Sequence, residues 1–235
     1  MSTMKSIPPQ RYVVAAIRPW NLSIFHARIA NISGKWHLIE NREDLTIERV
    51  AEINPRLVFV MHWSWRIEAA ILDGFECIGF HPSALPFGRG GSPIQNLISR
   101  GHRDTVLTAF RVVQEMDSGP IYFQRPMSLE GTAEEIFVRM ANLAADMIEA
   151  LVADTQKPQA QSGEPVVFTR RTPEQSAIPE DAGLSALFDH IRMLDAAEYP
   201  RAFLETGGLR FEFRNPVLRY GNIEARVEIT ERRDD

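Results

Sequence analysis

A histidine and an aspartate stand just beyond two predicted strands, where they could move protons. His81 follows the apolar run Cys77–Phe80 and opens a loop rich in proline and glycine. Asp117 lies in a Met-Asp-Ser-Gly-Pro turn after the predicted strand Thr105–Gln114. An imidazole paired with a carboxylate can accept a proton from one group and deliver it to another, as in many acyl-transfer sites. The alternatives are a hydrogen-bonded structural histidine and a turn-forming aspartate.

The first two thirds of the chain alternate short apolar runs with helical patterns. Continuous apolar runs occur at Tyr12–Ile17, Leu57–Met61 and Cys77–Phe80, as expected of strands covered on both faces. A crossover helix fits Ile67–Leu72. We therefore predict an α/β fold, with a Rossmann-like, mostly parallel sheet flanked by helices. In such sheets ligands collect beyond the carboxyl ends of the strands.

A hairpin and a long helix complete this first unit. Thr105–Gln114 and Ile121–Arg125 predict two strands joined at the aspartate turn. Thr132 and Glu135 form a capping box ahead of a long apolar helical face.

A polar stretch at residues 155–164 has the composition of a linker. It divides the chain into a catalytic α/β domain at residues 1–154 and a small α+β unit at residues 165–235. The elements expected in the second unit are strands at Val166–Phe168, Ala202–Glu205, Leu209–Phe213 and Ala225–Ile229, and a helix at Leu184–Met193. We expect this unit to pack on the first domain, although its last two strands could instead extend a partner's sheet in a homodimer.

Composition and charge exclude several partners. The 235 residues carry 31 Asp and Glu against 26 Lys and Arg, a net charge of −5, which gives no general footprint for nucleic acid. Cys77 is the single cysteine, so no internal disulfide can form. The sequence shows no signal peptide and no membrane span, so we expect a cytoplasmic protein with no membrane partner.

Several common chemistries lack their motifs. The stretch from Arg18 to Asn21 after the first run contains no glycine, which disfavours dinucleotide binding. Neither Ser64 nor Ser83 lies in a Gly-x-Ser-x-Gly nucleophile elbow. The other histidines show no metal-ligand spacing, so we expect no metal.

The loop sequence HPSALPFGRGGSPIQ from His81 to Gln95, followed by Met116-Asp117-Ser118-Gly119, resembles the formyltransferase family. The resemblance runs from about Leu57 to Leu151. It implies N10-formyltetrahydrofolate as the formyl donor, His81 as the group that stabilises and protonates the reacting centre, and Asp117 as its partner. Ser83 matches the motif serine.

The chain departs from the family pattern at Gly79, where the family has an asparagine whose amide helps to hold the oxyanion. Losing one such donor typically costs about 2.7–4 kcal/mol. Either another donor replaces it or catalysis is impaired. Asn96 and His62 are the candidate substitutes, and Asn96 could equally be an exposed helix residue.

The resemblance also implies where the folate and the acceptor bind. The residues implied for the folate are Met61, His62, Trp63, Ser64, Trp65 and Met116. The two tryptophans could instead be packed structural residues. The residues expected to face the acceptor are Arg18, Trp20, Asn21, Ser83 and Arg89. For Arg89 a solvated loop charge is the alternative.

The acceptor that the resemblance favours is a nucleotide-linked amino sugar. The segment Phe168–Ser176 resembles an element of sugar formyltransferases, whereas the acidic charge and short C-terminal unit argue against transfer RNA. The absence of a Gly and Ser nest after the first strand weakens glycinamide ribonucleotide. Two other functions stay open, a folate or nucleotide-sugar binding protein without turnover and a formyl-folate hydrolase.

Overall fold

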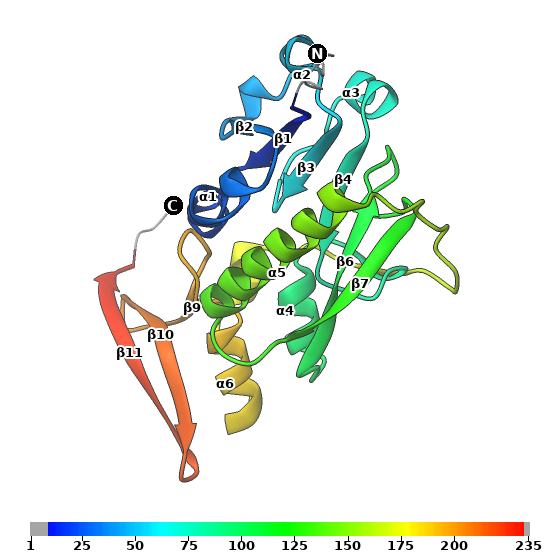
Figure 1. Cartoon of the computed structure of the whole chain (residues 1–235). Coiled ribbons are helices and arrows are strands. Elements are labelled where there is room, and N and C mark those ends of the chain that lie inside the picture. Colours follow the sequence, from blue (N-terminus) through cyan, green and yellow to red (C-terminus); the bar gives the residue numbers. More distant parts are fainter. Residues whose placement is uncertain (1–8, 233–235) are drawn as a thin grey trace, which may run out of the picture.

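The computed structural model describes residues 9–232 of the chain. A central six-stranded sheet has the order β2-β1-β3-β4-β6-β7 (Figure 1). Its strands are β1 (Arg11–Ala16), β2 (Lys35–Ile39), β3 (Leu57–Met61), β4 (Cys77–His81), β6 (Asp104–Arg111) and β7 (Ile121–Ser128). The first four strands are parallel and β6 and β7 are antiparallel, which confirms the predicted mostly parallel sheet.

Helices cover both faces of this sheet. One face packs against α1 (Pro19–Ala27), α4 (Pro93–Ile98) and α5 (Ala133–Ala153), and the other against α2 (Ile47–Ile53) and α3 (Ala69–Gly74). Strand β3 is buried along its whole length because side chains on both of its faces meet helices. The chain also forms short 3-10 helices at η1 (Ile29–Asn31), η2 (Arg42–Asp44) and η3 (Pro173–Ser176).

The long helix α5 starts where its capping box places it. The Thr132 hydroxyl accepts the backbone N–H of Glu135, and the Glu135 carboxylate accepts the backbone N–H of Thr132 at 2.8 Å. Such a cap typically contributes about 1 kcal/mol. Ten buried side chains then run along one face of α5 on the sheet, which confirms the predicted helix.

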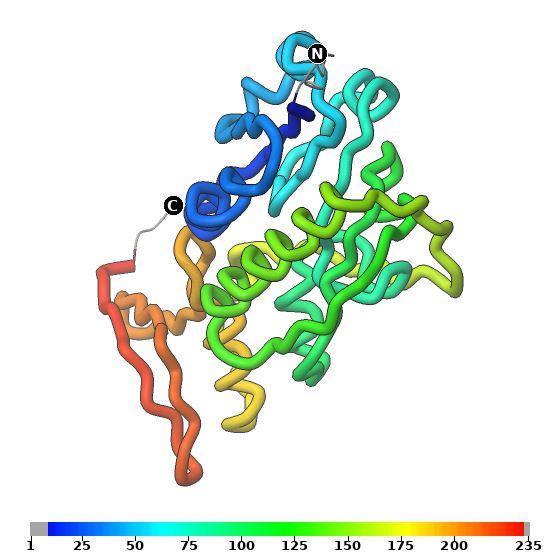
Figure 2. The backbone as a smooth tube through the Cα atoms, viewed as in Figure 1, coloured from blue at the N-terminus to red at the C-terminus, as the bar shows by residue number. Residues whose placement is uncertain are grey.

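The segment after α5 is docked on the first domain. Gln159 and Ile121, the first residue of β7, exchange two backbone hydrogen bonds of 2.8 and 2.7 Å. Figure 2 shows this yellow-green stretch running past the end of the β6–β7 hairpin. Strand β8 (Val166–Phe168) then pairs in parallel with β5 (Phe87–Gly90), which forms within the Gly-rich loop. The segment predicted as a linker is therefore held by specific contacts on both sides.

The C-terminal unit consists of α6 (Leu184–Arg192) and an antiparallel sheet. That sheet, ordered β11-β10-β9, contains β9 (Ala202–Thr206), β10 (Leu209–Arg219) and β11 (Asn222–Glu231). The buried Arg192 guanidinium donates to the carbonyls of Leu129 (2.6 Å) and Gly131 (2.9 Å). These bonds tie the unit to the first domain, as the sequence leads us to expect.

Several boundaries and elements differ from the sequence-based prediction. Helix α3 begins at Ala69 rather than Ile67, β6 ends at Arg111 rather than Gln114, and β10 continues to Arg219. The elements α1, α2 and β2 are additional. Strand β2 is an edge strand with half-buried side chains, so it lacks a continuous apolar run. No helix in residues 9–232 has the length and apolarity needed to cross a bilayer.

Candidate active site

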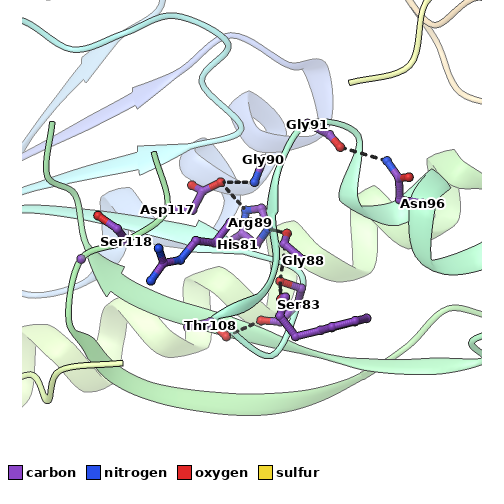
Figure 3. A network of polar contacts seen from close by, with 12 residues as sticks. His81, Ser83, Gly88, Arg89, Gly90, Gly91, Asn96, Thr108, Asp117 and Ser118 are labelled. Atoms are coloured by element: carbon purple, nitrogen blue, oxygen red, sulfur yellow. Dashed lines mark hydrogen bonds and ion pairs between the residues drawn. The ribbon is translucent and has the colours of Figure 1, made fainter. Parts of the chain in front are cut away.

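His81 and Asp117 meet at one edge of the sheet. His81 is the last residue of β4, opposite Thr108 of β6, and Asp117 lies in the loop that follows β6. The His81 Nδ1 atom lies 3.6 Å from Asp117 Oδ2 (Figure 3). Because β6 runs antiparallel to β4, its C-terminal end at Arg111 lies beside Ile78 near the start of β4. The loop after β6 must therefore return along β4 to bring Asp117 to His81, 36 positions away in the sequence.

The Gly-rich loop closes around the pair. His81 Nε2 lies 2.7 Å from the Gly88 carbonyl oxygen, and the Gly90 N–H donates to Asp117 Oδ2 at 2.9 Å. Both ring nitrogens of His81 therefore face oxygen atoms. The Gly88 carbonyl can only accept, so Nε2 carries the proton of that hydrogen bond, and Nδ1 is the ring nitrogen that faces the Asp117 carboxylate.

Two glycines make this loop path possible. Gly88 and Gly90 have φ of +78° and +103°, and a Cβ on Gly90 would stand 2.4 Å from the Phe168 carbonyl oxygen. A side chain at either position is therefore excluded by backbone conformation, and at Gly90 also by β8.

Ser83 is a structural residue of the same loop. Its hydroxyl donates to the Phe87 carbonyl at 2.7 Å, and its own carbonyl accepts the Thr108 hydroxyl at 2.6 Å. The side chain has no solvent exposure. The prediction that Ser83 faces the acceptor is therefore corrected, because its hydroxyl and carbonyl form hydrogen bonds within the protein that hold the loop in shape.

Phe110 occupies the space beside Gly79. A Cβ on Gly79 would lie 2.9 and 3.0 Å from two carbons of the Phe110 ring and 3.1 Å from Val112. The same ring meets the His81 ring edge-on at 6.5 Å. The missing asparagine is thus matched by an aromatic side chain that fills its place.

Asn96 does not replace the missing amide. Its Nδ2 donates to the carbonyls of Gly91 (3.1 Å), Ser92 (3.1 Å) and Thr169 (3.0 Å). Figure 3 shows the side chain turned toward Gly91 and away from His81. The proposed role of Asn96 as an oxyanion donor is therefore corrected, since its N–H groups bind backbone carbonyls just before α4 and just after β8.

Gln161 fixes the backbone of the aspartate turn, a role that the sequence does not reveal. Its Nε2 donates to the carbonyls of Asp117 and Gly119, both at 2.8 Å, and its Oε1 accepts from Arg89 Nε (3.1 Å) and Nη2 (2.7 Å). Asp117 has a φ of +51°, a conformation that needs such support. Arg89, also 3.7 Å from Glu115, is bound within the protein rather than free for an acceptor.

A second group of side chains lies beyond the carboxyl ends of β1 and β3. We call Arg18, Trp20, His62, Phe137 and Tyr199 the switch-point cluster, because the strand order reverses between β1 and β3. Trp20 stacks on Phe137 at 4.9 Å, His62 Nε2 lies 2.9 Å from the Tyr199 hydroxyl, and the Arg18 guanidinium lies 5.5 Å from the Tyr199 ring centre. Tyr199, from the C-terminal unit, is a contact that the sequence does not reveal.

Three buried nitrogens of the cluster have no partner among residues 9–232, namely Arg18 Nε, Trp20 Nε1 and His62 Nδ1. The first two are N–H donors, and the role of the third is set by the tautomer of the ring. Burial, followed by the charges of Arg18 and Arg170, lowers the pKa of His62 to about 3, so its ring is neutral at physiological pH. An unpaired buried donor costs about 1–3 kcal/mol. The cluster therefore suits a group that brings oxygen acceptors.

Other predicted binding residues are placed in different ways. Asn21 is buried and donates to the carbonyl of the buried Met61 at 3.1 Å, so it joins α1 to the end of β3 instead of facing an acceptor. The Trp63 and Trp65 rings meet edge-on at 5.3 Å, and Trp65 is 37% exposed. Ser64 between them is half-buried. Met116, next to the catalytic candidate Asp117, is 61% exposed.

Comparison with known proteins assigns the chain to a family. The model named "Formyl transferase" matches residues 23–152, more than half of the chain. The chain belongs to the formyl transferase family. A second model, "Methionyl-tRNA formyltransferase, C-terminal domain", matches residues 173–230.

Related proteins of the formyl transferase family differ in length. The methionyl-tRNA formyltransferase of Rickettsia felis is 31% identical over 58% of this chain and 48% of its own length, so the chain spans about half of that relative. The structure titled methionyl-tRNA formyltransferase from Clostridium thermocellum is 42% identical, with a TM-score of 0.90 over 94% of this chain and 99% of that one.

More distant structures share the fold. HypX from Aquifex aeolicus in complex with tetrahydrofolic acid is 17% identical, with a TM-score of 0.72 over 88% of this chain and 37% of that one. A sugar N-formyltransferase from Shewanella is 16% identical, with a TM-score of 0.68 over 88% and 97%. Within residues 9–232, His, Cys, Asp and Glu form no group of three that could hold a metal.

Proposed function

We propose that this protein transfers a formyl group from N10-formyltetrahydrofolate to a primary amine. The observation that carries the proposal is the His81–Asp117 contact of 3.6 Å inside a Gly-rich loop, in a chain of the formyl transferase family.

The reaction needs two proton movements that this pair can perform. N10-formyltetrahydrofolate supplies a formyl carbon bound to nitrogen, which the acceptor's amine attacks. Asp117 and His81 take the proton that the amine loses, and His81 delivers a proton to the departing nitrogen. Gly90, through its N–H on Asp117 Oδ2, holds the carboxylate toward the ring.

Apolar side chains after β3 and next to Asp117 suit a flat heterocycle. Met116 and Trp65 expose apolar surface, and Trp63 is partly buried against the core. Flat apolar walls beside a few polar groups are typical of sites for such ligands. We propose that Met116, Trp63 and Trp65 border the folate.

The proposed acceptor is a nucleotide-linked amino sugar. The unpaired N–H donors of Arg18 and Trp20 in the switch-point cluster need oxygen acceptors, which phosphates and sugar hydroxyls supply. The guanidinium groups of Arg18 and Arg170 make this region positive, since both lower the pKa of His62. Arg18 also pairs with Glu198 at 2.6 Å, so an anionic acceptor would compete with that carboxylate.

The match of residues 173–230 to a methionyl-tRNA formyltransferase domain favours a second candidate, transfer RNA. The charge of that region argues against it. These residues carry ten carboxylates against six arginines and no lysine. Arg210, Arg214 and Arg219 are each bound by glutamates within the unit, so they are poorly placed to neutralise phosphates.

Mass spectrometry of a defined reaction tests the proposal. The protein is incubated with N10-formyltetrahydrofolate and either nucleotide-linked amino sugars or methionyl-tRNA. A formyl group on an amino sugar supports the proposal. Formylated methionyl-tRNA would contradict the amino sugar and support transfer RNA as the acceptor. Formate released without an acceptor would instead identify a hydrolase.

A further inference from the structure

The backbone of Arg170, an exposed arginine just after β8, is fixed on both sides by other segments. On one side, the Asn96 amide donates to the carbonyl of Thr169 at 3.0 Å. On the other side, the backbone N–H of Arg171 donates to the Ser92 hydroxyl at 3.1 Å. These two bonds flank Arg170 in the chain. The Gly-rich loop and α4 therefore determine the course of the backbone at this arginine.

Gly91 lets Arg170 lie directly against the Gly-rich loop. A Cβ on Gly91 would stand 2.4 Å from the Cβ of Arg170 and 2.7 Å from its Cα, so no side chain fits between the two segments. Asn96 also donates to the Gly91 carbonyl at 3.1 Å, and Figure 3 shows its amide turned toward that residue. The preceding residue, Gly90, donates its N–H to Asp117. Arg170 is therefore held beside the part of the loop that contacts the catalytic candidate.

The guanidinium of Arg170, in contrast to its backbone, has no partner. It makes no hydrogen bond and no ion pair with any residue in the range 9–232. The neighbouring Arg171 guanidinium donates to the Gln175 carbonyl, and Arg18 is paired with Glu198 at 2.6 Å. Arg170 therefore contributes a positive charge that no carboxylate of the described chain neutralises.

This charge acts on the switch-point cluster. Burial raises the pKa of Tyr199, and the charges of Arg18 and Arg170 oppose that rise. The same two charges add to burial in lowering the pKa of His62 to about 3. Trp20 is 5% exposed, and its indole N–H has no partner among the described residues. A negatively charged group with several oxygen atoms would satisfy the indole and both guanidinium groups.

We propose that Arg170, together with Arg18, binds the diphosphate of the nucleotide-linked acceptor, and that Asn96 is the residue that positions Arg170. This inference rests on the proposed function, because it assigns one part of that acceptor. A planar guanidinium can donate two parallel hydrogen bonds to phosphate oxygens. The two arginines follow different strands, β1 and β8, so each is available to a different phosphate. Because the backbone of Arg170 is already fixed, little of it has to become ordered on binding.

Isothermal titration calorimetry tests the role of Arg170 without folate and without turnover. The probes are the diphosphates of uridine, thymidine and guanosine, with inorganic pyrophosphate beside them. The wild type should bind at least one nucleoside diphosphate more tightly than pyrophosphate. Arg170→Ala should weaken that binding by about tenfold or more, because charge-assisted hydrogen bonds to phosphate are lost. The matched control Arg226→Ala should bind like the wild type, since it removes an equal charge from an exposed, unpaired arginine of β11 in the described part of the chain.

The outcomes separate this inference from the proposed function. Equal affinities of the wild type and Arg170→Ala would overturn the inference. A wild type that formylates an amine but binds none of the nucleoside diphosphates, or binds pyrophosphate as tightly, would also overturn it and would leave formyl transfer intact. Binding that depends on Arg170 in a protein that transfers no formyl group would support the diphosphate site and contradict the proposed function alone.

A double-variant cycle tests whether Asn96 acts through Arg170. Asn96→Ala removes the bonds to Gly91 and Thr169, and it should weaken the same nucleoside diphosphate by about threefold or more. In the Arg170→Ala background this further loss should vanish, because no guanidinium is left to position. Thermal melting of each variant shows whether it is folded. An equal loss with and without Arg170 would overturn the positioning role, because Asn96 would then act on the fold in general.

Discussion

His81 is surrounded by groups that limit what its ring can do. Asp117 Oδ2 faces Nδ1, the Gly88 carbonyl faces Nε2, and the Phe110 ring closes a third side edge-on. No side-chain amide from position 79 can enter, because Phe110 fills that space. The proposed chemistry therefore rests on proton transfer by the pair, without the extra oxyanion donor that Asn would supply.

Gly79→Asn alone should lower the melting temperature, because its Cβ would collide with the Phe110 ring at 2.9 Å. Adding Phe110→Val removes the colliding ring atoms. In the double variant kcat should rise relative to Phe110→Val, by up to the roughly 10²-fold factor that one oxyanion donor contributes. Steady-state kinetics with Phe110→Val as the control check this. A double variant that folds and is no faster than Phe110→Val shows that the site does not use a donor at this position.

His62 should make stability depend on pH. Its pKa is lowered from 6.5 to about 3 by burial. The His62 ring is thus protonated below about pH 6.5 in the unfolded chain, but only below about pH 3 in the folded chain. The stability due to the neutral ring is complete above pH 6.5 and is lost as pH falls toward 3, by up to about 1.4 kcal/mol per unit.

Denaturant unfolding of His62→Asn beside the wild type measures this effect. Asparagine tolerates the positive φ of 51° at this position. The variant should lose less unfolding free energy than the wild type between pH 7 and pH 5. Equal losses in the two proteins would mean that the ring is protonated in the folded state.

The position of a single side chain can be predicted from the sequence only where the path of the backbone fixes it. His81 follows from the end of an apolar run, whereas Asp117 reaches it through a loop that returns along the antiparallel strand β4. Asn96 was misassigned because its amide finds the carbonyls of Gly91 and Ser92 close by in its own helix start. Gln161 could not be found, since it reaches Asp117 across 44 residues with no pattern to mark it.

Strands β3 and β4 and helix α5 follow from local signals, namely continuous apolar runs and a capping box. The Gly-rich loop is different, because its shape depends on β8 and on the segment at residues 155–164. Composition marks that segment as a linker, yet Gln159 and Gln161 bind it to the β6–β7 hairpin. Contacts between polar side chains and backbone atoms produce no periodic pattern in the sequence, so they cannot be predicted from it.

Gln161→Ala should lower kcat by about tenfold or more while KM for the acceptor changes little, because it frees the backbone of Asp117 and Gly119. A misplacement of 1 Å can cost about 10²-fold. Gln159→Ala is the matched control, since the bonds between Gln159 and Ile121 use backbone atoms only. Steady-state kinetics of both variants distinguish them. Equal rates for the two would show that the turn holds Asp117 without Gln161.

The whole molecule brings its C-terminal unit to the switch-point cluster through Tyr199 and Glu198. Both residues contact Arg18 beyond β1, so the smaller unit forms part of the wall of the proposed acceptor site. The acidic charge of that unit and the internal pairing of its arginines favour a small acceptor over a nucleic acid. These contacts join residues 180 positions apart and lie beyond the reach of sequence patterns.

The most direct test of the central claim is the rate of formyl transfer to an amine by three proteins in parallel, the wild type, His81→Asn and Asp117→Asn, followed by mass spectrometry of the acceptor. The account predicts transfer by the wild type and a loss of about 10²–10⁴-fold in kcat for each variant, with folded structure retained. Variants that transfer as fast as a competent wild type would contradict it.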